Sequence, residues 1–256
     1  MATGGFSVKN ASIEAYQSTY VQTVITLFML IAATNYFLHY RALRGDLAAF
    51  CRDREFLFYI GLLATAIGLI CLDLTFRTHT PATSAIRLAS FQVVSIVSTT
   101  GYSTADFDQW PHLARTVLFV LMLTGGCSGS TGGGIKQFRV LLVVKSAVAE
   151  LSKLVHPHAV IQIRMGHKPV SQEVLNGVTN FVLLYLGIFT LASVAMACLG
   201  LSLESALSSV ATTMAGIGPG LGSVGPAKNF AHVPDAGKWL LSGCMLLGRL
   251  ELYTAL

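Results

Sequence analysis

The stretch Ser98-Thr99-Thr100-Gly101-Tyr102-Ser103-Thr104 decides the fold, because two related stretches occur elsewhere in the chain. One is Ala2-Thr3-Gly4-Gly5-Phe6-Ser7, and the other is Ala211-Thr212-Thr213-Met214-Ala215-Gly216-Ile217-Gly218-Pro219-Gly220. The two stretches nearer the C-terminus each follow a short apolar segment, residues 84–97 and 203–213. They lie about 115 residues apart and are flanked by long apolar runs, which indicates an internal repeat.

The composition indicates an integral membrane protein. The 256-residue chain is 53% hydrophobic and only 11% charged, with a mean hydropathy of +0.64, whereas a soluble domain carries roughly 25% charged residues. The net charge of +5 is more typical of cytoplasmic loops in a membrane protein than of nucleic-acid binding. The five cysteines are odd in number and form no Cys-x-x-Cys pair, which argues against a disulfide framework or a zinc site.

Five apolar runs are predicted to be membrane spans. They cover residues 20–38, 56–74, 113–155 with a glycine-rich break at 125–134, 174–199 and 239–256. Basic loops follow the first and third runs, so the positive-inside rule makes both loops cytoplasmic and puts the three turns outside. The short segments 84–97 and 203–213 cannot cross a bilayer and are predicted to be re-entrant half-helices. The repeating unit is therefore span, half-helix, turn, span.

The turns have the chemistry of a cation filter. A Thr-Gly-Tyr-like turn between membrane helices is typical of a potassium filter, in which backbone carbonyls replace the water around the ion. Glycine allows the backbone to turn those carbonyls toward one axis. Each half-helix ends at its turn, so its negative dipole end favours a cation. The alternative is that the turns are ordinary helix-terminating loops, which their recurrence with the same flanks disfavours.

The three turns, the interrupted span at 125–136 and the ending Gly248-Arg249-Leu250-Glu251 occur in an order that resembles the Trk/Ktr superfamily of bacterial potassium transport subunits, and within it the Trk branch. The resemblance covers essentially the whole chain. It implies an all-α integral membrane fold in which tandem span–pore-loop–span repeats surround a pseudo-fourfold cation pore. Residues 1–50 would end the second repeat, 51–168 would form the third with its interrupted span, and 169–256 the fourth. The chain is therefore expected to be a C-terminal piece of a longer protein.

The resemblance also implies the site. Potassium would be the transported substrate, with no cofactor, and backbone carbonyls would bind it. The implied ion-coordinating residues are Thr3, Gly4, Thr100, Gly101, Ala215 and Gly216. Ser103 stands where a potassium channel has a second glycine, so we expect fewer well-formed ion sites than in such a channel. The turn at Ala215-Gly216 departs furthest from the pattern.

The glycine-rich break is the expected gate. Its glycines are Gly126, Gly129, Gly132, Gly133 and Gly134. Each costs about 1 kcal/mol relative to alanine in a helix, so a helix is disfavoured here. A loop at membrane depth must face a pathway or a packed interior. The resemblance implies that it obstructs the pore below the filter, whereas a helix-packing face of small residues is the alternative.

Arg249 is the second part of the expected gate. In a span that begins near Gly237 it lies about 18 Å along the helix, beyond the middle of a ~30 Å hydrocarbon core. A charge at that depth should face a cavity or a partner. The resemblance implies that it lies beneath the filter, either as a barrier to cations or as a donor to the loop carbonyls. Snorkelling to the cytoplasmic surface is the alternative.

Other functions fit the sequence less well. Gly126-Cys127-Ser128-Gly129 matches the motif of rhomboid intramembrane proteases, but His232 precedes Pro234 in a polar outer loop and is not expected to reach Ser128. An anion channel would place glycine turns at helix starts, whereas these turns follow their helices. A P-loop is excluded because Ile135 stands where the motif requires lysine. We therefore do not expect an enzyme.

The resemblance implies several partners and a location. It implies a homodimer of the full-length subunit, a nucleotide-binding regulatory ring on the cytoplasmic face and a surrounding lipid bilayer, with no nucleic acid. The chain would be a multi-pass protein of the bacterial inner membrane. The basic loop 153–168 is the expected contact for the ring.

Overall fold

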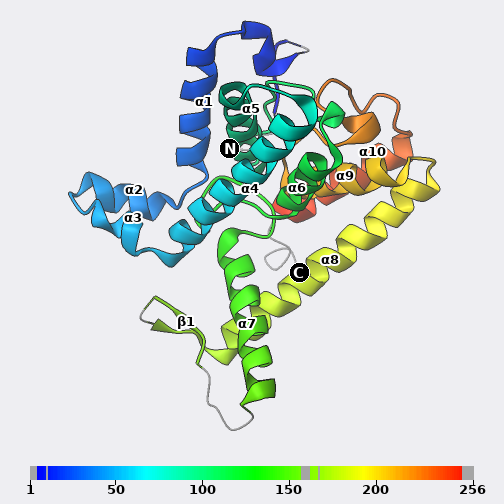
Figure 1. Ribbon diagram of the computed structural model, residues 1–256. Coiled ribbons are helices and arrows are strands. Elements are labelled where there is room, and N and C mark those ends of the chain that lie inside the picture. Colours follow the sequence, from blue (N-terminus) through cyan, green and yellow to red (C-terminus); the bar gives the residue numbers. More distant parts are fainter. Residues whose placement is uncertain (1–4, 10, 157–161, 167, 250–256) are drawn as a thin grey trace.

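A computed structural model describes residues 5–9, 11–156, 162–166 and 168–249. Helices make up most of this part of the chain, and the one small sheet found in it is a hairpin (Figure 1). The elements are η1 Ser12–Tyr16, α1 Thr19–Ala32, α2 Tyr36–Leu43, α3 Ala48–Arg52, α4 Arg54–Thr78, α5 Ala82–Val97, η2 Phe107–Gln109, α6 His112–Leu123, α7 Gln137–Val155, β1 Arg164–Met165, β2 Lys168–Pro169, α8 Gln172–Cys198, α9 Leu203–Ala215, η3 Gly222–Val224 and α10 Asp235–Arg249.

The helices α4 and α8 are the clearest membrane spans. Among the described residues they are the two single helices long and apolar enough to cross a bilayer, and the pair α1 and α2 would be a third span if counted as one. The predicted runs 56–74 and 174–199 are therefore confirmed. The Asp53 carboxylate caps α4 by accepting a hydrogen bond of 2.8 Å from the Phe56 N–H, which fixes where this span begins.

The predicted continuous span at 20–38 is wrong in its last part. The helix α1 ends at Ala32, and α2 continues at an angle of 99° to it. Asn35 causes the turn, because its backbone is extended and its side chain accepts a hydrogen bond of 2.8 Å from the Phe37 N–H to cap α2. In Figure 1, α2 and α3 project sideways from the end of α1. Of this predicted run, only the part in α1 forms a single straight helix.

The interrupted third span is confirmed. The helices α6 and α7 are separated by residues 124–136, in which no helix forms. The last predicted run, 239–256, begins earlier than expected, at Asp235, and residues 250–256 lie outside the described part of the chain. The basic loop after α7 contains the short antiparallel hairpin β1–β2, which had no counterpart in the predictions.

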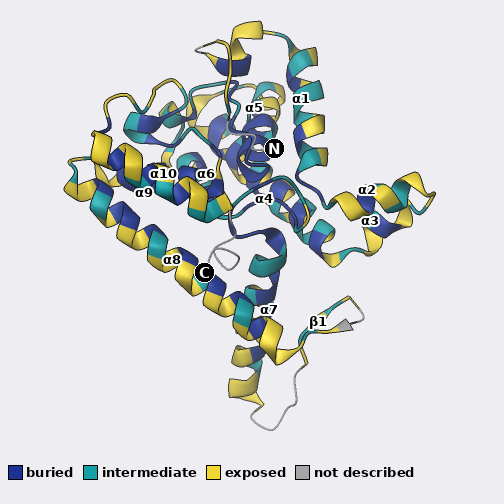
Figure 2. Ribbon diagram, turned by 180° about the vertical axis from the view of Figure 1, so that it is seen from behind, coloured by how far each residue is buried: buried dark blue, intermediate teal, exposed yellow. Residues whose placement is uncertain are grey.

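The half-helices α5 and α9 form the centre of the protein. Every residue of α5 from Phe91 to Val97 is buried, as is nearly all of α9 after its first turn (Figure 2). The helix α5 packs against α4, α1 and α6, whereas α9 packs against α8, α10 and α6. Both predicted half-helices are therefore confirmed, and each packs against the α-helix before it and the α-helix after it in the chain, α4 and α6 for α5 and α8 and α10 for α9.

Candidate functional site

One cavity brings five of the predicted site residues together. It has a volume of about 720 Å³ and opens between the three glycine turns, the loop 125–136 and α10. The predicted residues that line it are Gly101, Gly133, Ala215, Gly216 and Arg249. Segments more than 100 residues apart in the sequence thus meet around one space, as a pore requires.

Hydrogen bonds hold the turn that follows α5 in a defined conformation. The Ser95 carbonyl accepts from the Thr100 N–H at 2.9 Å, and the Ser95 hydroxyl donates to the Tyr102 carbonyl at 2.6 Å. Gly101 has a φ of +79°, and a β-carbon there would collide with the carbonyl of Ile217 in the turn after α9. Glycine is needed at this position both for its backbone conformation and for this close approach.

The first turn lies against the second. Thr3 and Gly4 lie outside the described residues, but Gly5 is described and has a φ of +68°. A β-carbon on Gly5 would be 2.7 Å from the Gly101 carbonyl oxygen, so the two turns are in direct contact. Thr100 is buried, and its hydroxyl forms a hydrogen bond of 2.8 Å with the Ser98 hydroxyl.

The turn after α9 meets its neighbour through the residue that follows the predicted pair Ala215 and Gly216. Ala215 is the last residue of α9, and Gly216 ends the helix in a left-handed conformation with a φ of +72°. The residue that packs against Gly101 is Ile217, and the following Gly218 also lines the cavity with a φ of +113°. Ile217 and Gly218 were not among the predicted site residues.

The glycine loop lies directly against two of the turns. A β-carbon on Gly133 would overlap the carbonyl of Ala215, and the Gly133 N–H donates a hydrogen bond of 3.2 Å to the Thr99 hydroxyl. Thr99 has a φ of +56°, an uncommon conformation for a β-branched residue, and its importance was not visible in the sequence. These contacts place the loop next to the ends of both half-helices.

The other loop glycines contact the rest of the protein. Gly126 packs against Ala33, Gly129 packs against the Asn35 side chain, and Gly132 is buried near Thr99 and Gly126. Gly134 has a φ of +77° and lies against the Thr124 carbonyl. Lys136 is also buried, and its ammonium donates to the carbonyls of Ser130 and Gly132. The loop is therefore closely packed rather than open to solvent.

Arg249 reaches this loop from α10. It is exposed to the cavity, and its Nη1 donates a hydrogen bond of 2.7 Å to the Thr131 carbonyl. Because α10 begins at Asp235, Arg249 lies about 21 Å along the helix. The predicted contact with a loop carbonyl is the arrangement that the structure contains.

Comparison with known proteins identifies the family. A family model described as TrkH, cation transport protein, matches residues 1–256. The chain belongs to this family. It is 39% identical over 258 residues to the Trk system potassium uptake protein TrkH of Salmonella typhimurium, covering 100% of this chain and 53% of that protein. The corresponding identity is 39% for TrkI of Halomonas elongata and 30% for TrkG of Escherichia coli.

A solved structure shares the fold of this TrkH-family chain. The crystal structure of the potassium transporter TrkH from Vibrio parahaemolyticus matches with a TM-score of 0.92 and 36% identity. The match covers 99% of this chain and 55% of that one. The chain thus spans about half the length of the curated relatives it matches. It belongs to a family of helical membrane transporters, so the predicted fold class is confirmed.

The protease alternative finds no support in this TrkH-family chain. The Ser128 N–H donates to the Glu55 carboxylate, whereas His232 Nε2 lies 2.9 Å from the Ser223 hydroxyl in the loop before α10. His232 Nδ1 lies 3.0 Å from the Asn229 carbonyl. Ser128 and His232 therefore have different partners.

One acidic residue near the turns, Asp108, connects two loops. Asp108 accepts a hydrogen bond of 2.8 Å from the Gly222 N–H, and it forms ion pairs of 3.3 Å with Arg115 and 3.2 Å with Lys228. Asp108 follows the turn after α5, whereas Gly222 and Lys228 follow the turn after α9. These contacts tie together the loops that support two neighbouring turns.

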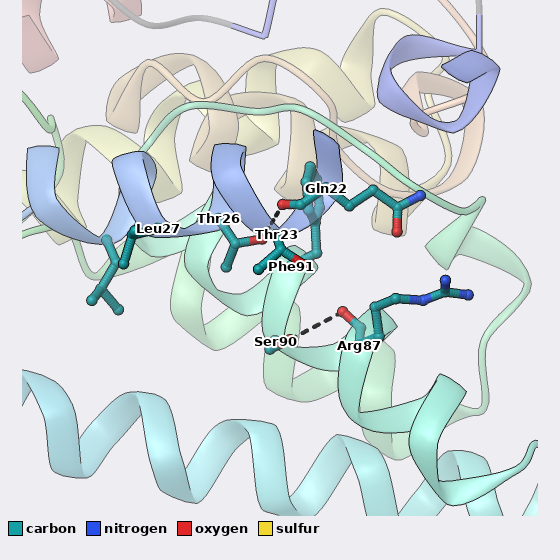
Figure 3. Close-up of a pocket in the computed structure, with 8 residues that line it drawn as sticks. Gln22, Thr23, Thr26, Leu27, Arg87, Ser90 and Phe91 are labelled. Carbon is teal, nitrogen blue, oxygen red and sulfur yellow. Dashed lines mark hydrogen bonds between the residues drawn. The ribbon is translucent and has the colours of Figure 1, made fainter. Parts of the chain in front are cut away.

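A second cavity lies between α1 and α5. It has a volume of about 250 Å³ and is lined by polar and apolar side chains, among them Gln22, Thr26 and Arg87 (Figure 3). Arg87 crosses between the helices by donating a hydrogen bond of 2.8 Å to the Thr19 hydroxyl. This cavity contains none of the predicted site residues among the described ones, so it is separate from the space between the turns.

Proposed function

We propose that the chain takes part in potassium uptake across the bacterial inner membrane, with the ion passing through the cavity between the glycine turns. The observation that carries the proposal is the meeting of the three turns, the glycine loop and Arg249 around one space. The names of the relatives, which are potassium uptake proteins and a potassium transporter, support it. Residues 1–50 would end the second pore repeat, and residues 51–168 and 169–256 would form the third and the fourth.

The turns would act as the filter. A potassium ion that loses its water needs several oxygen atoms in exchange, and the carbonyls of Thr100 and Gly101 and of the related turns would supply them. The carbonyls of Thr3 and Gly4 would serve the first turn. In the last turn, the contact of Ile217 with Gly101 favours Ile217 and Gly218 as ligands in addition to Ala215 and Gly216. The buried ends of α5 and α9 add negative dipole ends that favour a cation.

The glycine loop and Arg249 would form the gate. With Arg249 bonded to Thr131 and Gly133 against Ala215, the loop blocks the path from the filter toward the cytoplasm. The Arg249 charge also opposes the entry of a cation into the same space. Opening would require the loop to leave these contacts.

Partners would complete the pore and control it. The relatives' greater length supports a full-length subunit that carries further repeats, and we propose that two such subunits form a dimer. A cytoplasmic nucleotide-binding ring would bind near the basic segment 153–168. Substituting both Arg164 and Lys168 should weaken ring binding, and unchanged binding would contradict this contact.

Rubidium uptake is the direct test of the function. Cells without potassium uptake systems would express this chain alone, or this chain preceded by the upstream sequence that its relatives possess, and membrane amounts would be compared. Uptake by either form supports the proposal, and Gly101→Ala should abolish it because the new β-carbon would collide with Ile217. No uptake by either form at normal membrane amounts, with the regulatory ring also present, would refute it.

A further inference from the structure

Glu55 contacts both ends of the glycine loop. It lies in the first turn of α4 and is only 7% exposed. One oxygen of its carboxylate, Oε1, accepts a hydrogen bond from the Ser128 N–H in the first half of the loop. The same oxygen accepts one of 3.0 Å from the Phe138 N–H, in the first turn of α7 just after the loop. A single buried carboxylate thus joins the first half of the loop to the start of α7, the helix that follows it.

We propose that Glu55 is a positioning residue that fixes the two ends of the loop and so holds the gate in its resting place. This inference rests on the proposed role of the loop as a gate. No sequence motif includes Glu55, since it follows Asp53 and Arg54 where a charged residue at the start of a span is ordinary. Its role comes from the contacts alone.

The helix α7 needs this carboxylate. The first N–H groups of a helix have no partner within it, and a nearby anion also interacts favourably with the helix dipole. The residue at the cap position, Lys136, has a φ of +65° and makes no side-chain capping bond. Its side chain instead points back to the loop carbonyls. Glu55 therefore supplies from a neighbouring helix the acceptor that α7 lacks in its own sequence.

The first half of the loop is anchored to α4 and to the bend between α1 and α2, whereas the segment 131–133 has other contacts. Beside Glu55, the Cys127 N–H donates to the Ala33 carbonyl at 2.8 Å and the Tyr36 N–H donates to the Gly129 carbonyl at 3.2 Å. These bonds hold the residues from 127 to 129 against α4 and the bend between α1 and α2. The segment 131–133 instead faces Arg249 and the turns. The loop thus has fixed ends, set by Glu55, and a middle that borders the pathway.

The test combines a thiol probe with uptake. Cys127 lies in the loop and is 1% exposed, so its reaction rate with a membrane-permeant maleimide reports how firmly the loop is held. The assay uses a chain in which the other four cysteines are serine, in native membranes. Glu55→Ala should raise the Cys127 labelling rate on the order of tenfold, since hydrogen bonds to a charged acceptor are lost. Glu55→Gln keeps an oxygen acceptor and should show a smaller rise of about threefold.

The matched control is Asp53→Asn. Asp53 is a carboxylate two residues away at the same helix end, and it contacts Phe56 rather than the loop. This variant removes the same charge and keeps an acceptor, so Cys127 should react at the unaltered rate. In uptake, Glu55→Ala should raise the maximal rubidium rate several-fold and leave the half-saturating concentration unchanged, because the filter is untouched.

The outcomes separate the two proposals. Labelling of Cys127 at the unaltered rate in both Glu55 variants would overturn the positioning role. If the Glu55→Ala protein does not reach the membrane, the labelling rate in Glu55→Gln alone decides the question. A rise that Asp53→Asn reproduces would also overturn it, since charge loss alone would then be the cause. Faster labelling without any change in uptake would uphold the positioning role and refute the gating role of the loop.

Discussion

Replacing Gly133 by alanine should open the gate. The new β-carbon would lie 2.2 Å from the carbonyl oxygen of Ala215, far inside van der Waals contact. Ala215 is the last residue of α9, so its carbonyl cannot move without disturbing the turn. The φ of Gly133 is not positive, so alanine itself fits the local backbone. The whole effect therefore comes from the collision, and the loop must move away from the turns to relieve it.

The size of the effect follows from the cost of overpacking. An extra methyl group in a closely packed site typically costs about 1 to 3 kcal/mol. If that cost falls on the closed position of the loop alone, the ratio of closed to open forms drops by a factor of about 5 to about 160. Because the Gly133 N–H would also leave the Thr99 hydroxyl, the upper part of that range is the better expectation.

Rubidium uptake in the form of the chain that supports transport is the assay, with membrane amounts measured in parallel. The matched control is Gly132→Ala, since a β-carbon there would meet its nearest neighbours at 3.3 Å and 3.4 Å, a tight fit that small shifts relieve. Gly133→Ala should raise uptake at least several-fold, and Gly132→Ala should change it little. Equal uptake by Gly133→Ala and the unaltered chain would refute the reasoning, as would equal increases in both variants.

Three further predictions concern single contacts. Arg249→Ala should raise rubidium uptake about two- to tenfold, because one charge-assisted hydrogen bond in a solvated cavity is lost; uptake below that of the unaltered chain would contradict it. Asp108→Ala should lower the discrimination of rubidium against sodium, since Gly222 loses its acceptor; an unchanged uptake ratio would contradict this. Asp73→Ala should destabilise the protein by about 1 to 3 kcal/mol without changing selectivity, because the buried Asp73 carboxylate accepts a hydrogen bond of 2.9 Å from the Ala114 N–H, and thermal denaturation in detergent measures it.

The sequence predicts the helices and their order well, because in a membrane the apolar length of a segment largely determines its structure. The spans α4 and α8 and the half-helices α5 and α9 follow from this alone. The bend after α1 was missed because the apolar pattern continues through it into Tyr36 and Phe37. Asn35, a frequent N-cap residue, was the signal that could have found it.

The site is predictable in kind but not in detail. A turn rich in glycine after a half-helix indicates carbonyl ligands, yet the residue of one turn that meets its neighbour depends on contacts over more than 100 residues. The approach of Ile217 to Gly101 is such a contact. Glu55 and Thr99 were missed for the same reason, since each is defined by the loop it bonds rather than by its sequence neighbours.

The packing of the glycine loop bears on how a gate of this kind could work. Gly125 and Gly133 have ordinary φ angles, and each is required because another backbone segment lies where a side chain would be. These two glycines therefore allow backbone to pack closely on backbone, although the segment is a loop and not the helix-packing face that the sequence offered as the alternative. A packed loop opens only when specific contacts break, and those facing the pathway include Arg249 with Thr131 and Thr99 with Gly133. Removing one of them should therefore open the gate partly, and removing both should open it further, since the remaining bonds, to Glu55 and to the bend between α1 and α2, lie away from the segment 131–133.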